Sequence, residues 1–302
     1  MNDKHLIVIA GPTASGKTAT AIKIAKALDT VIISADSRQF YKEIPIGTAA
    51  PTKEELSEVQ HYMIHNLNVE DKYDVADYEH DVLLLLKQLF LTHDIVVMTG
   101  GSGLFIDAVC NGLDSIPDIS DEIRNKVNEL YEKGGLTNLQ SELQNLDPEY
   151  YNIVDKYNPR RLQRAIEVCY QTGLPYSSFR KNHAKERDFN IIKLAIHWDR
   201  NELIARINKR VENMISDGLV NEARNMYPKR HLNSLNTVGY KEMFQHFDGK
   251  ISLSEAIEQI KISTRQYAKR QMTWLRKNNN YQWFSIDEIP KMLEYIDSEI
   301  SK

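Results

Sequence analysis

Gly11-Pro12-Thr13-Ala14-Ser15-Gly16-Lys17-Thr18 lies between an apolar run at residues 6–10 and a segment without Gly or Pro at residues 19–28. Apolar residues recur at helical spacing in that segment, so the stretch is a loop between a strand and a helix. This context is typical of a P-loop, in which backbone N–H groups at a helix N-terminus bind phosphate. Lys17 adds a positive charge, and the Thr18 hydroxyl is suited to hold Mg²⁺. We therefore predict that these eight residues bind a diphosphate or triphosphate.

The rest of the chain predicts an α/β fold around this loop. Further apolar strands are expected at residues 31–34, 93–98, 191–198 and 281–284. A parallel crossover needs only about a dozen residues, whereas about ninety separate the strand at 93–98 from the strand at 191–198. The intervening sequence predicts helices at 121–131, 136–146 and 159–172. We predict a P-loop NTPase-like parallel sheet core at 1–114 and 191–302, with a small helical domain inserted at 115–190.

The composition excludes several classes of protein. The net charge of −4 argues against a generally basic nucleic-acid binder, so such a partner requires a local basic patch. Two cysteines, Cys110 and Cys169, form neither a disulfide framework nor a zinc site. The chain shows no signal peptide pattern, and its apolar runs are far shorter than a membrane span. We expect an unanchored cytoplasmic protein.

Polar residues follow two of the predicted strands. Asp36 comes directly after the strand at 31–34, at the sheet edge where ligands of α/β proteins bind. An isolated Asp in this place is more often a helix cap, but its position near the P-loop favours a ligand contact. The second glycine-rich turn, residues 99–104, permits close approach of a ligand. It lacks the Mg²⁺-binding Asp of a typical P-loop NTPase, which makes ATP hydrolysis less expected.

Basic residues gather on three predicted helices. Arg160, Arg161 and Arg164 occupy the start of one helix, and Arg206 and Arg210 share a face of another. On the long helix at 254–276, every seventh residue from Ile260 through Tyr267 to Trp274 is expected to face the core. A second stripe on this helix contains Lys261, Arg265, Lys269 and Lys277, and residues 261–277 include no acid. This stripe predicts an anion-binding face such as an RNA contact, although a solvated surface remains the alternative for all these charges.

Six motifs together resemble the tRNA dimethylallyltransferases in their short bacterial form. They are GPTASGKT (11–18), SADSRQFY (34–41), TGGSGLF (99–105), NPRRLQRAIEV (158–168), TVGYKE (237–242) and TRQYAKRQMTWLRK (264–277). The resemblance implies transfer of a dimethylallyl group from its diphosphate to the N6 amine of the adenine at position 37 of tRNA, beside the anticodon, with release of diphosphate. It also implies a P-loop core pierced by a channel, and a helical insertion that grips the anticodon stem-loop.

The resemblance implies roles for individual residues. Asp36 matches the family's general base, and Lys17 and Ser102 join it as predicted catalytic residues. The predicted tRNA contacts are Asp36, Ser37, Arg38, Gln39, Ser102, Arg124, Arg160, Arg161, Leu162, Gln163 and Arg164, to which the basic stripe adds Arg265 and Lys269. Arg206 and Arg210 are weaker candidates for diphosphate contacts, because they also suit an ordinary helix surface. Mg²⁺ near Thr18 is the expected cofactor.

Two departures and three alternatives accompany this assignment. Phe105 replaces the usual Tyr of the second glycine-rich turn, and the loop at 61–65 also differs from the family pattern. An AMP prenyltransferase, a small-molecule P-loop kinase and an RNA-binding switch stay open as other functions. The large insertion and the basic helix favour tRNA over a mononucleotide. No protein partner is evident, and we expect a monomer.

Overall fold

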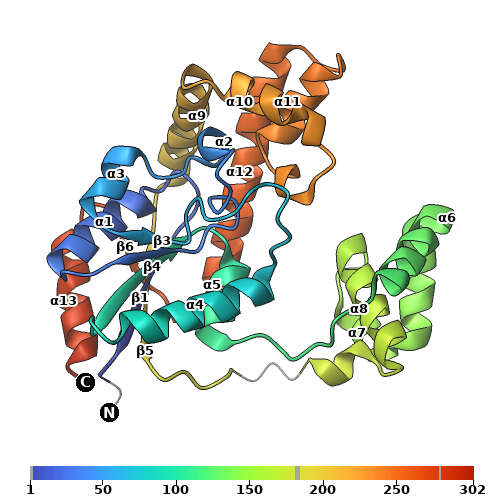
Figure 1. The fold of residues 1–302 in the computed structure, drawn as a ribbon, viewed down its shortest axis with the longest axis horizontal. Coiled ribbons are helices and arrows are strands. Elements are labelled where there is room, and N and C mark those ends of the chain that lie inside the picture. The colour runs from blue at the N-terminus through green and yellow to red at the C-terminus, as the bar shows by residue number, and fades with distance from the viewer. Residues whose placement is uncertain (1–2, 181–183, 279) are drawn as a thin grey trace. The chain divides into compact units, whose positions relative to one another are not determined.

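The structure is a computed structural model that describes residues 3–180, 184–278 and 280–302. The chain divides into two compact units (Figure 1). The core unit comprises Met1–Cys110 and Arg187–Lys302, and the inserted unit comprises Asn111–Glu186. These boundaries lie four residues before the positions 115 and 190 that the sequence suggested for the first and last residues of the insertion.

The core unit contains a six-stranded sheet with the order β3-β2-β4-β1-β5-β6. Its strands are β1 (His5–Ala10), β2 (Ile32–Ser34), β3 (His61–Tyr62), β4 (Ile95–Gly100), β5 (Asn190–Ile196) and β6 (Gln282–Phe284). Every pairing is parallel, and Ala10 at the end of β1 lies opposite Gly100 of β4 and Ala195 of β5. The predicted parallel α/β core is therefore confirmed, and the loops after β1, β2 and β4 emerge at one edge of the sheet.

Helices cover both faces of this sheet (Figure 1). Ile7 and Ile9 of β1 pack against α1 (Lys17–Ala27) and α13 (Ile289–Ile300). Leu6 and Val8 face the opposite side, where α4 (Val75–Leu89) and α5 (Gly103–Asn111) pack. Burial on both faces explains why the strands are almost continuously apolar rather than alternating.

A second helical layer lies beside the sheet in the core unit. It consists of α9 (Arg200–Ser216), α10 (Leu219–Met226), α11 (Tyr240–Phe247) and α12 (Leu253–Lys277). The shorter elements of this unit are α2 (Pro45–Thr48), α3 (Lys53–Glu58), η2 (Tyr227–Lys229) and η3 (Asn233–Leu235). Helix α12 begins with a capping box between Ser252 and Glu255. Its Ile260 packs among α9, α10 and α11, whereas its Leu275 packs on the sheet, so one helix belongs to both hydrophobic clusters.

The inserted unit is helical and has its own core. It contains α6 (Asp121–Leu146), α7 (Pro148–Ile153), α8 (Pro159–Thr172) and η1 (Tyr176–Phe179). The two helices expected at 121–131 and 136–146 are confirmed: α6 consists of two helical stretches joined at a kink, where Gly135 has the non-helical φ 60° and ψ −147°. Asp147 and Asn158 cap α7 and α8 by accepting hydrogen bonds from the backbone N–H groups of Tyr150 and Arg161.

Arg187 fixes the point at which the chain returns to the core unit. Its Nε donates to the Val109 carbonyl at 2.8 Å, and its Nη2 lies 2.7 Å from both Glu79 Oε1 and the Ala108 carbonyl. Both Arg187 and Glu79 side chains are about nine-tenths buried, so this ion pair is largely shielded from water. Cys110 and Cys169 are buried and free. Within the described residues, no helix combines the length and apolarity needed to cross a membrane.

Candidate active site

The P-loop forms one wall of a small cavity at the sheet edge. Strand β1 ends at Ala10, and α1 begins at Lys17 after Gly16, which has φ 85°. This positive φ favours glycine, and a Cβ on Gly16 would lie 2.4 Å from Ile286 Cδ1. Thr13, Ala14, Gly16, Lys17 and Thr18 line the cavity, which measures about 90 Å³. Three other predicted phosphate ligands, Gly11, Pro12 and Ser15, are buried and do not line it, so their contact with a phosphate stays a prediction.

Lys17 is the lysine of this cavity. Its Nζ donates a hydrogen bond to the Pro12 carbonyl at 2.8 Å. Burial lowers its pKa to about 8; the Asp36 carboxylate opposes this shift, and the Arg210 guanidinium adds to it. Lys17 is therefore mostly protonated at neutral pH and is placed to interact with an anion in the cavity.

The two arginines of α9 differ in their placement. Arg210 lines the P-loop cavity, and its Nη2 donates to the Thr48 carbonyl at 3.3 Å. Arg206 is exposed; its Nε donates to the Ala14 carbonyl at 2.8 Å, and its guanidinium stacks 4.3 Å from the centroid of the Trp198 ring. Trp198 in turn donates to the Ser15 carbonyl. Arg210 thus faces the P-loop cavity, whereas Arg206 holds the P-loop from its outer side.

Asp36 connects this cavity with a larger one of about 320 Å³. Asp36, Thr13 and Arg210 each line both cavities. Among the described residues that line either of them, only Asp36 carries a carboxylate. Asp36 Oδ1 accepts a hydrogen bond from the Arg38 backbone N–H at 3.2 Å, which orients the side chain. Asp36 therefore supplies a carboxylate proton acceptor where the P-loop cavity and the larger cavity meet.

Ser102 supports the loop that carries Asp36. The Ser102 Oγ accepts a hydrogen bond from the Ser37 backbone N–H at 3.0 Å and lies 3.1 Å from the Ser37 Oγ. Ser102 does not line either cavity, so its placement indicates positioning of the Asp36 loop rather than contact with a ligand. The predicted role of Ser102 as a catalytic residue stays a prediction.

The other residues of the Asp36 loop also hold neighbouring segments. Arg38 Nη1 donates to the carbonyls of Asn233 and Ser234 at 3.2 and 3.1 Å. Gln39 Nε2 donates to the Ala49 carbonyl at 3.1 Å. Ser37 and Arg38 line the larger cavity, and Gln39 lines the P-loop cavity. These side chains are accessible from the cavities while they organise their walls.

Helix α12 brings to the site residues that the sequence did not assign to it, among them Tyr267 and Gln271. Tyr267 was expected in the core but instead lines the larger cavity, where its hydroxyl lies 3.5 Å from the Gly101 carbonyl. Burial and the nearby Asp36 carboxylate raise the pKa of Tyr267 to about 12, so its phenol stays neutral. Gln271 is buried and lines the P-loop cavity. The heptad spacing correctly identified the inward face of α12, but it does not distinguish a cavity wall from a packed core.

Both departures from the family pattern lie at defined places in the core unit. The Phe105 ring packs between two aromatic rings, with centroids 5.8 Å from Phe40 and 5.0 Å from Tyr78. The Tyr78 hydroxyl donates to the Ser34 carbonyl, so this cluster supports the end of β2. In the loop at 61–65, His61 and Tyr62 form the edge strand β3.

The predicted RNA contacts of the inserted unit fall into two groups. Arg160 and Arg161 are exposed, and Arg164 lies 3.9 Å from Glu167. Burial raises the pKa of Glu167, and the nearby charges of Arg164, Arg124 and Arg160 oppose this shift, so these three arginines cluster around one carboxylate. Leu162, in contrast, is fully buried, and the buried Gln163 bonds to Asn128. Both side chains are buried in the unit, so the structure shows no exposed side-chain surface for the predicted contact of these two residues with RNA, which stays a prediction.

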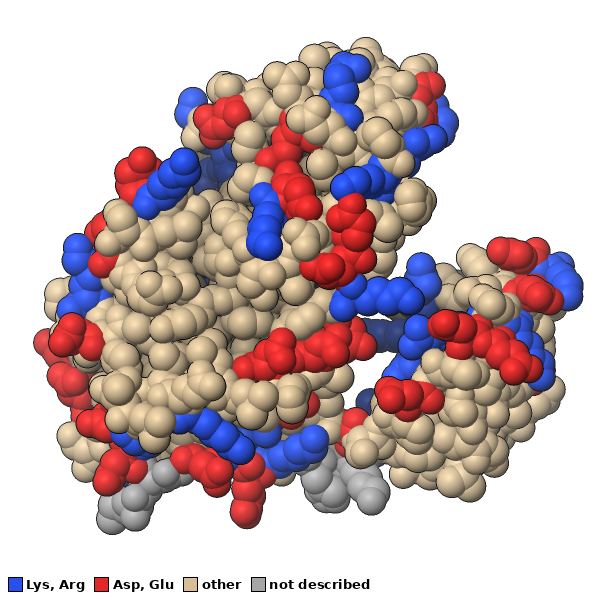
Figure 2. Space-filling model, in the orientation of Figure 1, with Lys and Arg blue, Asp and Glu red and all other residues tan. Residues whose placement is uncertain are grey.

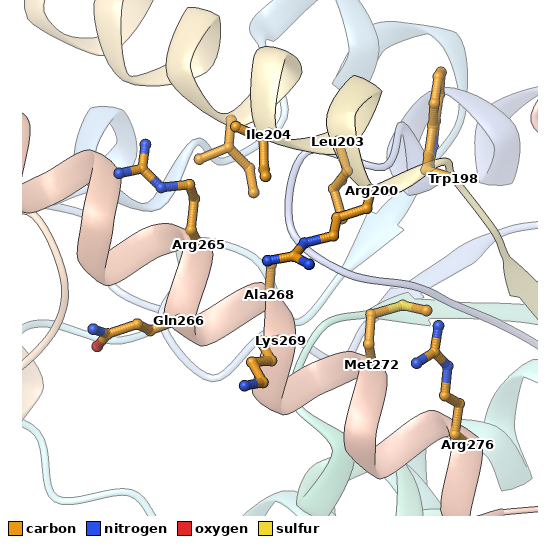
Figure 3. Close-up of a pocket in the computed structure, with 11 residues that line it drawn as sticks. Trp198, Arg200, Leu203, Ile204, Arg265, Gln266, Ala268, Lys269, Met272 and Arg276 are labelled. Atoms are coloured by element: carbon orange, nitrogen blue, oxygen red, sulfur yellow. The ribbon is translucent and has the colours of Figure 1, made fainter.

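Arg265 and Lys269 line a groove between α9 and α12 with a volume of about 490 Å³. They project from α12 together with Arg276, and Arg200 extends from the start of α9 (Figure 3). No acidic residue lines this groove among the described residues, and its floor includes Leu203, Ile207 and Ala268. Arg265 also bonds to Asn208 at 2.8 Å. Lys261 departs from the predicted stripe, because it pairs with Glu258 at 2.9 Å and Glu212 at 3.3 Å.

The overall charge distribution does not mark an RNA-binding face by itself. On the face shown in Figure 2, Lys and Arg are interspersed with Asp and Glu on both units. This mixing agrees with the net charge of −4. Within the described residues, no group of three His, Cys, Asp or Glu side chains could hold a metal ion.

Comparisons with known proteins agree with this geometry. A model of the family described as IPP transferase matches residues 39–278. The tRNA dimethylallyltransferase of Christiangramia forsetii is 50% identical over 98% of this chain and 99% of its own length. The tRNA dimethylallyltransferase 1 of Phocaeicola vulgatus is 50% identical over 97% of this chain and 98% of its own length.

Solved structures give the same result for the fold. The tRNA isopentenylpyrophosphate transferase of Bacillus halodurans has a TM-score of 0.73 and 32% identity, covering 99% of this chain and 97% of its own. A eukaryotic dimethylallyltransferase acting on tRNA has a TM-score of 0.79 at 24% identity, covering 94% of this chain and 74% of its own, and shows a shared fold. With its P-loop core and its near full-length match to these relatives, the chain belongs to the IPP transferase family.

Proposed function

We propose that this protein transfers a dimethylallyl group from dimethylallyl diphosphate to the N6 amine of the adenine at position 37 of tRNA, beside the anticodon, and releases diphosphate. Relatives named tRNA dimethylallyltransferase match nearly the whole chain at 50% identity and support this proposal. The observation that carries it is the position of Asp36. This carboxylate lines both the P-loop cavity and the larger cavity, so it adjoins a phosphate site and a space for an acceptor.

The P-loop cavity is proposed to bind the diphosphate. In this reaction the bond between the allylic carbon and the diphosphate oxygen breaks, so negative charge increases on the leaving group. Donors that are already oriented stabilise such charge most effectively. Lys17, Arg210 and the N–H groups at the start of α1 are the donors at this cavity. Arg206 would act indirectly by holding the Ala14 carbonyl from outside.

The site is compatible with the proposed Mg²⁺. Thr18 is the second residue of α1 and lines the P-loop cavity. Mg²⁺ commonly takes one or two protein ligands and fills its other positions with phosphate oxygens and water, so a cluster of carboxylates is not required. When bound, it would supply charge neutralisation to the diphosphate. The Thr18 hydroxyl is its proposed protein ligand.

Asp36 is the proposed general base on the acceptor side. The lone pair of an adenine N6 amine is delocalised into the ring, so this amine is a weak nucleophile. Removal of its proton by a positioned carboxylate therefore assists attack on the allylic carbon. As the new C–N bond forms and the C–O bond breaks, the N6 proton passes to Asp36. The adenine must leave its stack in the RNA to enter the larger cavity. This extrusion costs a few kcal/mol, which contacts between the protein and the RNA offset.

Two sets of basic residues are proposed to bind the anticodon stem-loop. In the inserted unit these are Arg124, Arg160, Arg161 and Arg164. The last three lie in the first two turns of α8, and Arg124 lies near Glu167 of that helix. In the core unit they are Arg265 and Lys269 of the α9–α12 groove. Substrates as small as AMP need neither set. The cytoplasmic location and the monomeric state stay predictions.

Incubation with radiolabelled dimethylallyl diphosphate and one acceptor at a time tests the proposal. We expect label in unmodified tRNA, mapped to adenine 37 by nuclease digestion, and none in AMP. Transfer to AMP instead would identify an adenylate prenyltransferase. Phosphorylation from labelled ATP without prenyl transfer would identify a kinase, and tRNA binding without either reaction would leave an RNA-binding switch.

A further inference from the structure

We propose that Gln271 is a positioning residue that locks the phosphate-binding loop to the glycine turn beside Asp36. Its Oε1 accepts a hydrogen bond from the Thr13 backbone N–H at 2.8 Å, and its Nε2 donates to the Gly101 carbonyl at 2.8 Å. The side chain is only 6% exposed. This role rests on the proposed function, because it concerns the geometry between the two reacting groups.

The bridge joins the loops that follow two neighbouring strands of the sheet, β1 and β4, beyond the point where the strands stop pairing at Ala10 and Gly100. Thr13 follows β1, Gly101 follows β4, and Gln271 belongs to α12. The amide side chain supplies, on two separate atoms, the acceptor for the Thr13 N–H and the donor for the Gly101 carbonyl. The fit is also steric, since a Cβ on Gly101 would lie 2.4 Å from Gln271 Nε2.

From Gly101 the connection continues to the proposed base. Ser102 follows Gly101 and bonds to Ser37, the neighbour of Asp36. The Asp36 Oδ2 lies 3.7 Å from the position that a Gly101 Cβ would occupy, so the turn packs directly against this carboxylate. At the other end, Thr13 lines both cavities. Gln271 therefore sets the separation between the diphosphate site and the group that takes the N6 proton.

This separation matters because transfer requires the N6 amine, the allylic carbon and the diphosphate oxygen to be aligned. A displacement of about 1 Å by a residue remote from the chemistry can reduce the rate by roughly 100-fold. Gln271 also occupies the Thr13 N–H, which removes this donor from the set that faces a bound phosphate. We thus expect its loss to reduce kcat while the affinities for both substrates change little.

Gln271→Met tests this role, because methionine matches the length and fills the buried space but makes neither hydrogen bond. We expect kcat for tRNA prenylation to fall about 100-fold, with both KM values within about threefold of the parent. Gln271→Glu keeps the acceptor for Thr13 but places a buried carboxylate oxygen against the Gly101 carbonyl, so its decrease should be at least as large. Gln259→Met applies the same substitution to an exposed residue of α12 and serves as the matched control.

A double variant separates positioning from general destabilisation. If Gln271 acts through Asp36, adding Gln271→Met to Asp36→Asn should slow single-turnover transfer by no more than about twofold further. All rates are measured at least 15 °C below the unfolding midpoint of each variant. Multiplicative losses, or a parental kcat in Gln271→Met, would overturn the proposal. Absence of prenyl transfer in the parent protein would instead refute the proposed function.

Discussion

Asp36→Asn is the sharpest test of the proposed chemistry. The Asp36 Oδ1 accepts from the Arg38 N–H, and an Asn Oδ1 keeps this bond, so the loop geometry should survive. What disappears is the proton acceptor, and general base catalysis typically contributes 10²–10⁴-fold. This range corresponds to about 2.7–5.5 kcal/mol of activation free energy. We expect single-turnover transfer to fall by that factor while tRNA affinity stays near that of the parent.

The charge that Asp36 loses also affects its neighbour. The Asp36 carboxylate raises the pKa of Lys17, which burial has lowered to about 8. In Asp36→Asn the pKa of Lys17 should therefore fall further, and the assay belongs near pH 6.5 so that Lys17 stays protonated. At that pH removal of a carboxylate from the cavity should leave the affinity for dimethylallyl diphosphate unchanged or tighter. Asp297→Asn, which changes an exposed residue of α13, is the matched control. A near-parental rate for Asp36→Asn in a folded protein would refute the assignment of the base.

Three further predictions test the cradle, the RNA contacts and the sheet edge. Calorimetry should show the highest affinity for dimethylallyl diphosphate below pH 8, where Lys17 is protonated, and a decline as the pH rises through about 8 and Lys17 loses its proton. Lys17→Arg should remove this decline. An identical pH profile in both proteins would contradict the assignment. Arg161→Ala and Lys269→Ala should each make the slope of log tRNA affinity against log salt shallower by roughly 0.7–0.9, measured by filter binding, whereas Lys261→Ala, whose lysine is already paired, should not; equal slopes throughout would count against RNA contacts. Gly100→Ala would place a Cβ 2.2 Å from the Ala35 carbonyl oxygen, so urea denaturation should show a loss of about 1–3 kcal/mol or more, and unchanged stability would contradict the close approach.

The sequence predicted the P-loop and the sheet well, because both depend on local patterns. The apolar runs and the glycine spacing identified β1, β4 and the start of α1 without tertiary information. The caps at Asp147 and Asn158 were also predictable, since each combines an N-cap residue with a following Pro. These signals lie within a few residues of the elements they define.

Properties that depend on packing between distant segments were not predictable in the same way. Leu162 and Gln163 lie between exposed arginines in the sequence, yet the helical repeat turns them into the core. The absence of acids from residues 261–277 suggested a free basic stripe, but Glu212 of α9 neutralises Lys261 from outside that segment. Gln271 carries no local signal, because its partners lie 258 and 170 residues away. Its motif indicated importance without indicating what the side chain contacts.

Helix α12 packs in two hydrophobic clusters, so its rotation about its own axis must suit both clusters and the site between them. Ile260 anchors the helix in the α9–α11 layer, Leu275 anchors it on the sheet, and Tyr267 and Gln271 lie between these anchors. One residue inserted or deleted between Ile260 and Tyr267 rotates the remainder by about 100° relative to the first anchor. Either Leu275 or Ile260 would then face solvent, and the two polar side chains would leave the cavity. Point substitutions on the exposed face of α12 are therefore expected to be tolerated far better than any change in its length.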